Sequence, residues 1–318
     1  MASATRQTFG RRQRVSQRIN TIVKPASRDG VGPSAVALPP GQWQTIIDFL
    51  VEQFPAIPRS EWMARMQRGD VLDAHGQVLS IASGYQPNSK IFYFRSLPVE
   101  PRIPFDEVVL YQDDYLVAVD KPHFLPVTPA GRYLQETLLV RLKNSLGIDT
   151  LAPMHRIDRE TAGLVLFTIQ PHTRNLYQSL FRERSVSKEY EAIAPYRADL
   201  VLPTTYRSRL LESAAFMKME EVAGEANAET AIALIEVQGA LARYKLEPVS
   251  GQKHQLRAHM AALGIPIVND RIYPELYPDE GAEQDYSQPL KLLAKAIQFT
   301  DPLSGQIRKF ASERTLSF

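Results

Sequence analysis

The sequence predicts an α+β protein with a mixed, mainly antiparallel sheet and a small α/β accessory module ahead of a larger domain. Segments typical of strands outnumber those typical of helices, and the two kinds do not alternate regularly as they do in doubly wound α/β proteins. A proline-rich stretch separates two regions of different pattern. The length of 318 residues allows one large domain or two modest ones, and 44% hydrophobic residues provide ample material for a core.

The first 38 residues are predicted to be a disordered basic tail. They contain few large apolar residues, show no periodicity, and carry seven Lys and Arg side chains against one acid, Asp29. The rest of the chain is therefore mildly acidic, since the whole chain carries a net charge of only +2. Such a tail suits a loose, salt-sensitive contact with a polyanion such as nucleic acid. A solvated leader without a partner is the alternative.

Residues 39–97 are predicted to form the small accessory module, a candidate for RNA binding. Large apolar residues recur at helical spacing over 43–54. A second, short helix follows, for which Ser60 is the expected N-cap. A strand is expected over 90–95, and the prolines within 97–105 indicate a linker.

Residues 98–318 are predicted to form one larger domain. Two acidic residues, Asp113 and Asp114, lie between its first two strands and indicate a hairpin turn. Residues 274–289 are acidic and broken by prolines, which is typical of a surface loop. The expected strands cover residues 108–111, 115–119, 163–169, 188–194, 231–237 and 243–246.

Composition excludes several classes of protein. Cysteine is absent, so disulfide frameworks, thiol nucleophiles and thiolate metal sites are excluded. No run of about 18 apolar residues is present to span a membrane, and no apolar core follows the basic N-terminus as it would in a signal peptide. We therefore expect a soluble, cytoplasmic protein with no membrane partner.

Two loops carry residue patterns that suit catalysis. The segment 120–129 follows a strand and holds three prolines, which forbid regular pairing and make it a rigid loop. In the segment 155–163, Asp158 lies between Arg156 and Arg159. Adjacent cations favour the ionised carboxylate and suit it to act as an anionic nucleophile or base. A surface ion-pair loop of little energetic consequence is the alternative.

A third segment, 250–267, combines a helical pattern with a cluster of basic side chains. Gly264 is a natural residue to end the helix, and a helix N-terminus of this kind attracts phosphate. His254 and His259 are five residues apart, which places them about 140° apart around a helix. Neither an HExxH motif nor a thiol is present, so we expect no metal ion.

Taken together and in this order, the three segments resemble the RluA-type family of RNA pseudouridine synthases. The family signature H-R-L-D-R-x-T-S-G-L is similar to HRIDRETAGL at 155–164, D-K-P-x-G-L-P-V is similar to DKPHFLPV at 120–127, and T-G-R-x-H-Q-L-R-x-H is similar to SGQKHQLRAH at 250–259. The resemblance extends over residues 108–312 and implies that residues 98–318 form a pseudouridine synthase catalytic domain.

The resemblance implies an isomerase that detaches uracil from its ribose, turns the base over and rejoins it through carbon, with no cofactor and no metal. The family's catalytic aspartate falls on Asp158, and whether it attacks the sugar or promotes elimination to a glycal stays open. The active-site tyrosine falls on Tyr190, where a phenol can stack on the detached base and relay the proton lost from its carbon. The arginine of HQLR falls on Arg257, which is suited to a bidentate pair that keeps Asp158 ionised and aimed.

The resemblance also implies a partner, a stem-loop of ribosomal or transfer RNA. The target uridine must be flipped out of its stack, and Arg156 resembles the arginine that fills the vacated position. We expect Lys188 and His254 to contact the RNA as well. Gln252 stands where the family usually has arginine, which removes a positive charge at a phosphate contact. A monomer is expected.

Two other functions stay open from the sequence. A catalytically inactive RNA-binding protein could keep this scaffold, but a binder has no use for a carboxylate such as Asp158 that faces a phosphate-rich ligand. A glycoside hydrolase also cleaves a glycosidic bond at a carboxylate, but it normally needs two carboxylates that flank the bond. Glu160 is the acidic residue nearest to Asp158 in the sequence.

Overall fold

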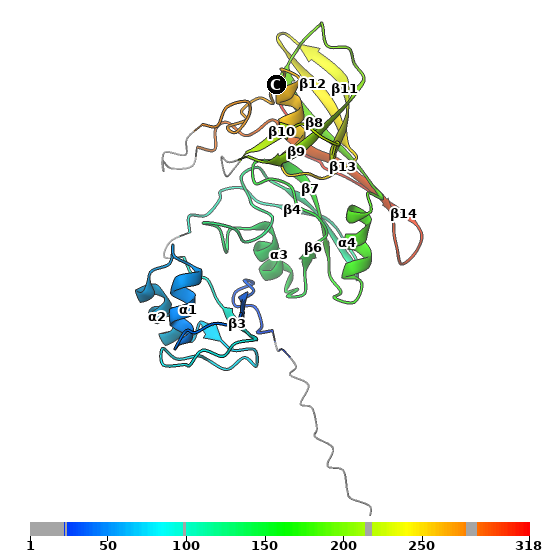
Figure 1. Ribbon diagram of the computed structural model, residues 1–318. Coiled ribbons are helices and arrows are strands. Elements are labelled where there is room, and N and C mark those ends of the chain that lie inside the picture. The colour runs from blue at the N-terminus through cyan, green and yellow to red at the C-terminus, as the bar shows by residue number, and fades with distance from the viewer. Residues whose placement is uncertain (1–21, 23, 98–99, 214–217, 278–284) are drawn as a thin grey trace, which may run out of the picture. The chain divides into compact units, whose positions relative to one another are not determined.

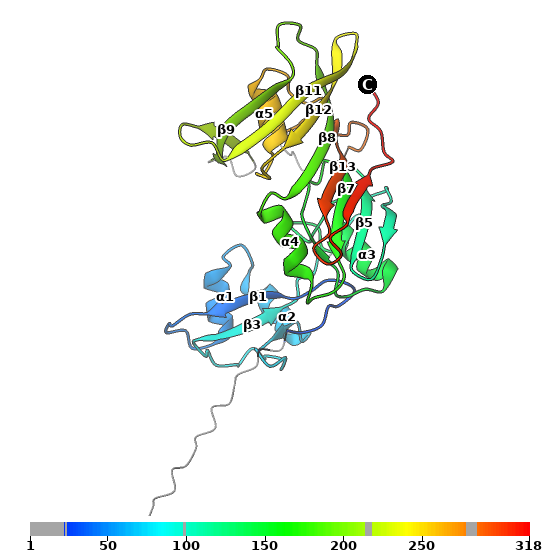
Figure 2. The ribbon, with the colours of Figure 1, turned by 90° about the vertical axis from the view of Figure 1, so that its right-hand side faces the viewer.

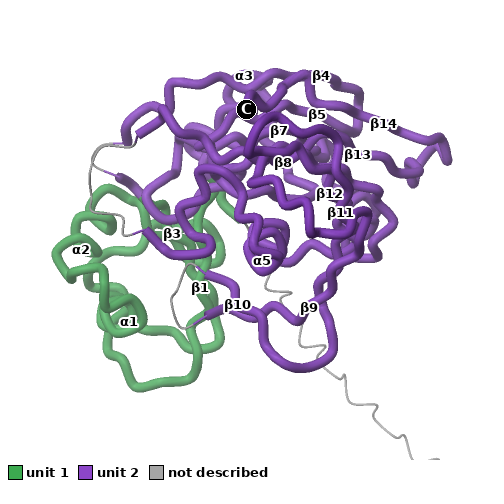
Figure 3. The backbone as a smooth tube through the Cα atoms, turned by 90° about the horizontal axis from the view of Figure 1, so that it is seen from above, with its two compact units in different colours: residues 1–26, 32–95 green, residues 27–31, 96–318 purple. Residues whose placement is uncertain are grey.

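The computed structural model describes residues 22, 24–97, 100–213, 218–277 and 285–318. The chain divides into two compact units, of which unit 1 contains Gly32–Arg95 and unit 2 contains Ser27–Val31 and Ser96–Phe318 (Figure 3). Most of the predicted tail, residues 1–21 and 23, lies outside the described residues, as do residues 98–99 of the predicted linker.

Unit 1 is a small antiparallel sheet with two helices. Its strands pair in the order β1-β3-β2. Thr45 caps α1 in a capping box, since its hydroxyl accepts a hydrogen bond from the main-chain N–H of Asp48 and the Asp48 carboxylate accepts one from the N–H of Thr45. The side chain of Trp62 is fully buried in the core of the unit. The elements are β1 (Ser34–Leu38), α1 (Ile46–Gln53), α2 (Arg59–Gln67), β2 (Val71–Leu72) and β3 (Ser89–Tyr93).

The structure corrects two predictions in this part of the chain. Residues 34–38 form β1 instead of continuing the predicted disordered tail, because all five pair with β3 and Leu38 is buried. Two alanines make the apolar pattern of this strand weak, and its pairing partner lies far along the chain, so local sequence carries little signal. The second helix begins after Pro58, in extended conformation, and not at Ser60 as an N-cap.

Unit 2 is organised around one long sheet. Its strands follow the order β10-β9-β11-β12-β8-β13-β7-β5-β4, with β14 paired to β13 and β6 paired to β7. Among the described strands, β7 and β13 form the one parallel pair. The prediction of an α+β fold with a mainly antiparallel sheet is therefore confirmed. The elements are β4 (Val108–Gln112), β5 (Leu116–Lys121), α3 (Leu138–Leu146), β6 (Ala152–Pro153), β7 (Ala162–Thr168), α4 (Arg174–Arg182), β8 (Val186–Pro195), β9 (Thr204–Glu212), β10 (Met219–Val222), β11 (Ala228–Gln238), β12 (Leu241–Pro248), α5 (Gln255–Ala262), β13 (Leu292–Thr300) and β14 (Ile307–Ala311) (Figure 1).

Strands β5 and β7 are buried along their whole length because helices cover both faces of the sheet here. Val165 and Phe167 of β7 pack in one cluster with Leu138 and Leu142 of α3. The alternate residues of the same strand pack in another cluster with Tyr177 of α4. The two helices lie on opposite sides of the sheet in Figure 2. This explains why the sequence of β7 is a continuous apolar run and not an alternating one.

The other half of the sheet is covered by α5. Leu256 and Met260 of this helix pack against Ala192 of β8 and Tyr244 of β12. The two halves meet where β7 pairs with β13. At this junction Gly163 has φ +108°, and a Cβ atom on it would lie 2.3 Å from the carbonyl oxygen of Ala294, so only glycine allows the strands to approach. The junction brings the loop that precedes β7 next to β8 and α5.

Candidate active site

A pocket of about 100 Å³ lies where the loop before β7, the strand β8 and the start of α5 come together. It collects residues from segments that are far apart in the sequence. All six residues predicted for the site line it, namely Arg156, Asp158, Lys188, Tyr190, His254 and Arg257. The structure thus brings the predicted set together, and the individual roles stay predictions until they are tested.

The loop that carries Asp158 is fixed at its beginning by His155. The main-chain N–H of Leu166 on β7 donates to Nε2 of His155 at 3.2 Å, and the imidazole stacks on Phe181 of α4 with ring centres 4.5 Å apart. Burial lowers the pKa of His155 to about 3, so the ring stays neutral and can accept this hydrogen bond. His155 is therefore an anchor for the loop, and the Asp158 side chain, 23% exposed, faces the pocket.

The far end of the same loop is held by the proline-rich segment 120–129. Lys121 is fully buried, and its Nζ donates to two carbonyl oxygens of its own segment and to that of Arg159 at 3.0 Å. His123 donates from Nδ1 to the carbonyl oxygen of Glu160 at 2.7 Å. Burial lowers the pKa of Lys121 to about 7, against the opposing charges of Glu160 and Asp158. The prediction of a loop did not anticipate these two donors, which hold consecutive carbonyl groups just after Asp158.

Arg257 of α5 lies between two carboxylates. Its Nη1 is 3.3 Å from Oδ2 of Asp158, while its Nε and Nη2 form a bidentate pair with Asp270 at 2.8 and 2.7 Å. The predicted bidentate pair with Asp158 is therefore wrong, because the fork of the guanidinium is occupied by Asp270. Burial alone would lower the pKa of Arg257, but the hydrogen bonds and charge of Asp270, and then the charge of Asp158, raise it.

Asp270 was missed by the sequence reasoning. Its side chain is fully buried, and besides Arg257 it accepts hydrogen bonds from the main-chain N–H groups of Ile272 and Tyr273 at 2.8 and 3.1 Å. The signal that could have found it is a single acidic residue two positions after the apolar stretch 265–268, at a depth where a charge must have a partner. Asp270 fixes the guanidinium so that one edge remains for Asp158.

Tyr190 and Lys188 project from β8 into the same pocket, since residues two apart on a strand share a face. Burial, and then the negative charge of Asp158, raise the pKa of Tyr190, so its phenol keeps its proton at physiological pH. Lys188 donates from Nζ to the carbonyl oxygen of Ser250 at 2.8 Å. Burial and the charge of Arg184 lower the pKa of Lys188 to about 8.

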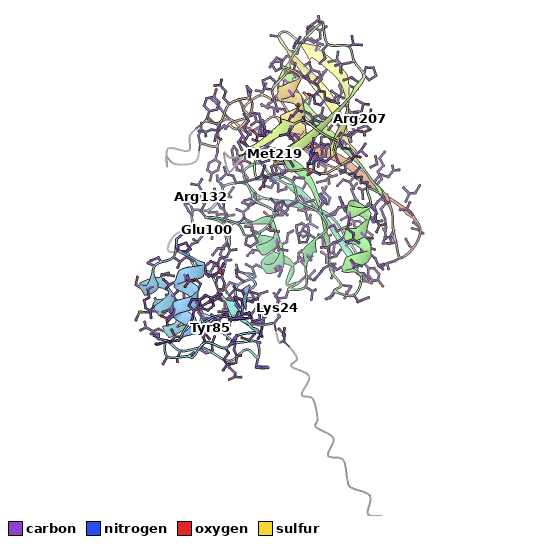
Figure 4. All side chains as sticks on the ribbon, in the orientation of Figure 1. Lys24, Tyr85, Glu100, Arg132, Arg207 and Met219 are labelled. Atoms are coloured by element: carbon purple, nitrogen blue, oxygen red, sulfur yellow. The ribbon has the colours of Figure 1, made fainter. Side chains whose placement is uncertain are left out.

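His254 occupies the N-cap of α5 in the left-handed conformation, with φ +53°. Its Nε2 is 3.9 Å from Oδ1 of Asp158, its Nδ1 is 3.5 Å from the hydroxyl of Tyr273, and its side chain is 10% exposed. The same hydroxyl bonds to both main-chain groups of Met219, which is labelled in Figure 4. Burial lowers the pKa of His254, although Asp158 opposes this shift. The imidazole therefore lies mainly against protein groups, and its predicted RNA contact stays a prediction.

A buried polar network holds α5 in place and was also missed. Ser250 donates to Oε1 of Gln255 at 2.7 Å, and Nε2 of Gln255 donates to the Thr230 hydroxyl at 2.9 Å. The Thr230 hydroxyl and the Ser208 hydroxyl lie 3.0 and 3.1 Å from the two ring nitrogens of His259. Burial lowers the pKa of His259 to about 4, so its ring is neutral and serves the network. Within the HQLRAH motif, His254 and Arg257 therefore face the pocket, whereas Gln255 and His259 hold α5 in place.

Arg156 differs from the other basic residues of the site. Its side chain is exposed at the pocket, and no hydrogen bond or ion pair to it is found among the residues that the structure describes. Within the same described ranges, no group of three His, Asp or Glu side chains is arranged to hold a metal ion. No helix in the described part of the chain is long and apolar enough to cross a membrane.

Comparisons with known proteins agree with this geometry. Residues 115–262 match the family model described as RNA pseudouridylate synthase. The dual-specificity RNA pseudouridine synthase RluA of Pasteurella multocida is 30% identical over 227 residues, which are 67% of this chain and 94% of that protein. An uncharacterized RNA pseudouridine synthase of Synechocystis is 27% identical over 283 residues, 82% of this chain and 95% of that protein.

A solved structure supports the fold separately. Human RNA pseudouridylate synthase domain containing 1 superposes with a TM-score of 0.53 over 68% of this chain and 86% of that chain, at 18% identity. The matched family segment contains Asp158, Tyr190 and Arg257, which line one pocket. The resemblance noted from the sequence motifs is thereby confirmed. The chain belongs to the RluA-type family of RNA pseudouridine synthases and is an isomerase that converts uridine in RNA to pseudouridine.

Proposed function

We propose that the protein modifies specific uridines in stem-loops of ribosomal RNA, transfer RNA or both, with Asp158 as the catalytic carboxylate. The observation that carries this proposal is the convergence of Asp158, Tyr190 and Arg257 on one pocket. The printed name of the Pasteurella multocida relative, a dual-specificity enzyme, supports a target shared by two classes of RNA. A cytoplasmic location and a monomeric state remain predictions from the sequence.

The three side chains suit three different tasks. Asp158 would engage the ribose of an extruded uridine, either by attack on the sugar or by promoting a glycal, while the bond from ribose to nitrogen breaks. Tyr190, which keeps its proton, offers a flat face to the detached base. Its hydroxyl would relay the proton that the carbon of the base loses when that carbon bonds to the ribose. Arg257 would keep Asp158 charged and aimed through the 3.3 Å contact.

Arg156 and Lys188 would bind the RNA around this centre. An exposed guanidinium without a protein partner can lie between bases or bond to phosphate, which suits Arg156 to fill the position that the flipped uridine leaves. Lys188 has three N–H donors, of which one is bonded to Ser250 in the described structure. We propose that the others meet the flipped nucleotide.

The glycoside hydrolase alternative receives no support from the pocket. Glu160, the second carboxylate that hydrolysis would need, is bonded to Nε of Arg159 at 2.7 Å and does not line the pocket. The inactive-binder alternative would leave the ion pair of Arg257 with Asp158 without a use. The carboxylate, phenol and guanidinium that line the pocket suit isomerisation better than either alternative.

The test compares Asp158→Asn with the matched control Glu160→Gln, on total RNA from cells that lack the enzyme. Carbodiimide primer extension maps the pseudouridines formed. We expect Asp158→Asn to lower kcat on the order of 10⁴-fold while RNA binding persists, and Glu160→Gln to retain most of its turnover. Full turnover by Asp158→Asn contradicts the proposal, and release of free uracil that depends on Glu160 supports hydrolysis instead.

A further inference from the structure

Four helices of the protein end in the same way. In each, the first or second residue after the helix adopts a left-handed conformation, and the next main-chain N–H bonds back to the carbonyl group five residues before it, which is the Schellman arrangement. These return bonds run from Asp70 to Arg65, from Ile148 to Lys143, from Ser185 to Leu180 and from Ile265 to Met260. The left-handed residues are Gly69 with φ +74°, Gly147 with φ +68°, Arg184 with φ +58° and Gly264 with φ +72°.

Arg184 at the end of α4 is therefore the exception among these four helices. Glycine suits this position because it has no Cβ atom to clash with the neighbouring carbonyl oxygen, and an arginine there destabilises the helix end. No side-chain hydrogen bond or ion pair within the described residues offsets that cost. The side chain is exposed, and neither a hydrogen bond nor an ion pair to its guanidinium is found there.

The position of Arg184 relates it to the active site. The turn that contains it leads from α4 directly into β8, which carries Lys188 and Tyr190 into the pocket (Figure 2). Its charge acts on Lys188, which lines the pocket, and on Glu229 of β11. After burial, it is the charge of Arg184 that lowers the pKa of Lys188, and it adds to the stronger effect of Arg207 in lowering the pKa of Glu229.

Ser250 connects Lys188 with Glu229. The carbonyl oxygen of Ser250 accepts from Lys188 at 2.8 Å, and its hydroxyl accepts from the main-chain N–H of Glu229 at 2.9 Å. Ser250 itself lines the pocket. Arg184 precedes the first residue of β8 by two positions, so its exposed side chain lies at the start of the strand that carries Lys188 and Tyr190 into the pocket.

We propose that Arg184 binds a phosphate group of the substrate RNA beside the nucleotide that enters the pocket, and that this contact is the reason for a strained arginine at the end of α4. The inference rests on the proposed function, because it requires an RNA strand to pass the start of β8. A guanidinium can hold a phosphate through two parallel hydrogen bonds. Such a contact positions the strand without reading its bases, so it affects binding and KM more than kcat.

Four variants separate the charge from the strain. Arg184→Gly removes both, Arg184→Ala removes the charge and keeps the strain, and Arg184→Lys keeps both. Arg182→Ala is the matched control, because Arg182 is also exposed at the end of α4 but lies 3.8 Å from the Glu183 carboxylate. The measurements are the Tm, the Kd for a fluorescein-labelled stem-loop RNA with a loop uridine over a series of salt concentrations, and kcat and KM for pseudouridine formation.

We expect Arg184→Gly to be more stable and yet to bind RNA less tightly. Removal of the left-handed arginine should raise the Tm by about 2–4 °C. Loss of one phosphate contact should weaken binding about three- to tenfold and lower the slope of log K against log salt by about 0.7–1. Arg184→Ala should bind equally weakly without the gain in Tm. Arg184→Lys should stay close to the wild type, and Arg182→Ala should change Kd less than about twofold.

The opposite signs of the two effects make the result decisive. A stabilised Arg184→Gly with unchanged Kd and salt slope overturns the proposal, as does an equal loss of affinity in Arg182→Ala, which would indicate a general charge effect. A lower Tm in both Arg184→Gly and Arg184→Ala would indicate a structural role and also overturns it. Failure of the wild type to form pseudouridine would contradict the proposed function, whereas an active wild type with unaltered KM in Arg184→Gly contradicts the phosphate contact alone.

Discussion

The arginines along α2 of unit 1 differ in their partners from two arginines near the pocket of unit 2. In unit 1, α2 carries or adjoins three arginines, and each is tied to a carboxylate: Arg59 to Asp48 at 2.8 Å, Arg65 to Glu61 at 2.9 Å and Arg68 to Asp70 at 2.9 Å. In unit 2, Arg156 and Arg184 stand at or near the pocket with no such partner among the described residues.

A cation that is already paired with a carboxylate contributes little to the attraction of a phosphate, because the pair carries no net charge and would have to be broken. Arg59, Arg65 and Arg68 along α2 therefore form a neutralised row, in which each positive charge is balanced by a carboxylate. The surroundings of the pocket in unit 2 present positive charge that is not balanced in this way. We infer that the surroundings of the pocket contribute more to the free energy of RNA binding than α2 does. A count of arginines in the sequence does not reveal this difference, because pairing is a property of the fold.

Among the tests of this comparison, the largest expected effect concerns Arg257, the paired arginine that lines the pocket. Asp270→Asn places an amide NH2 group, which cannot accept, where one of the two carboxylate oxygens accepts from Nε or from Nη2 of Arg257, so the guanidinium loses its fixed position. We expect kcat to fall about 10²-fold, because a small displacement of a positioning group is costly in catalysis, with a smaller change in KM. Steady-state kinetics on an RNA stem-loop measures both.

Asp301 provides a matched control for that variant. Like Asp270, it is a buried carboxylate that accepts from two main-chain N–H groups, here of Leu303 and Ser304, and from Nε of an arginine, here Arg308 at 3.1 Å. Both Asp270→Asn and Asp301→Asn should lower the free energy of unfolding by about 3 kcal/mol or more. Only Asp270→Asn should lower the kcat of the folded enzyme. Equal values of kcat in the two variants would limit Asp270 to a structural role.

Local pattern was sufficient to predict the strands and the catalytic motifs, but not the partners of buried polar groups. The hairpin at Asp113 is present as expected, and its carboxylate accepts from the N–H groups of Tyr115 and Leu116. Asn269 adopts a left-handed conformation with φ +63°, which asparagine tolerates better than most residues. A turn of this kind depends on a few neighbouring residues, so it can be predicted from the local sequence alone.

The contacts that were missed join residues from different parts of the chain. The sequence predicts a bidentate pair of Arg257 with Asp158. No local feature of the sequence indicates that Asp270 forms the bidentate pair instead. The donors of Lys121 to the loop of Asp158 likewise become visible only after the sheet brings the two segments together. The short strand at 34–38 was missed for the same reason, since it is defined by pairing with β3.

An effect of intermediate size is expected on the stability of the two units at acid pH. Unit 2 contains His123, His155 and His259, whose pKa values burial lowers to about 4, 3 and 4, whereas unit 1 contains only the exposed His75. Because the unfolded chain takes up these protons near pH 6.5 and the folded unit does not, unit 2 should lose stability as the pH falls from 6.5 towards 4. Each such histidine adds a slope of up to about 1.4 kcal/mol per pH unit.

The two units can be followed separately, because both tryptophans, Trp43 and Trp62, lie in unit 1. Urea unfolding monitored by tryptophan fluorescence should change little between pH 7 and pH 5, while pseudouridine formation and the circular dichroism of the large sheet should be lost at lower urea at pH 5. His259→Asn should flatten the pH dependence of unit 2 by one proton. A parallel acid shift of the fluorescence transition would contradict the assignment to unit 2.

The smallest effect on RNA affinity is expected for substitutions in the neutralised row of unit 1. Arg59→Ala and Arg68→Ala each remove an arginine whose charge is already balanced, so we expect the Kd for a stem-loop RNA to change less than about twofold and the free energy of unfolding to fall by no more than about 1 kcal/mol. Arg156→Ala removes an unpaired cation and should weaken binding several-fold while lowering the salt slope by about 0.7–1. Fluorescence anisotropy over a salt series measures all three variants. A loss of affinity in Arg68→Ala as large as that in Arg156→Ala would contradict the comparison. It would mean that Arg68 leaves the carboxylate of Asp70 to bind RNA, so that both units bind the substrate through arginine.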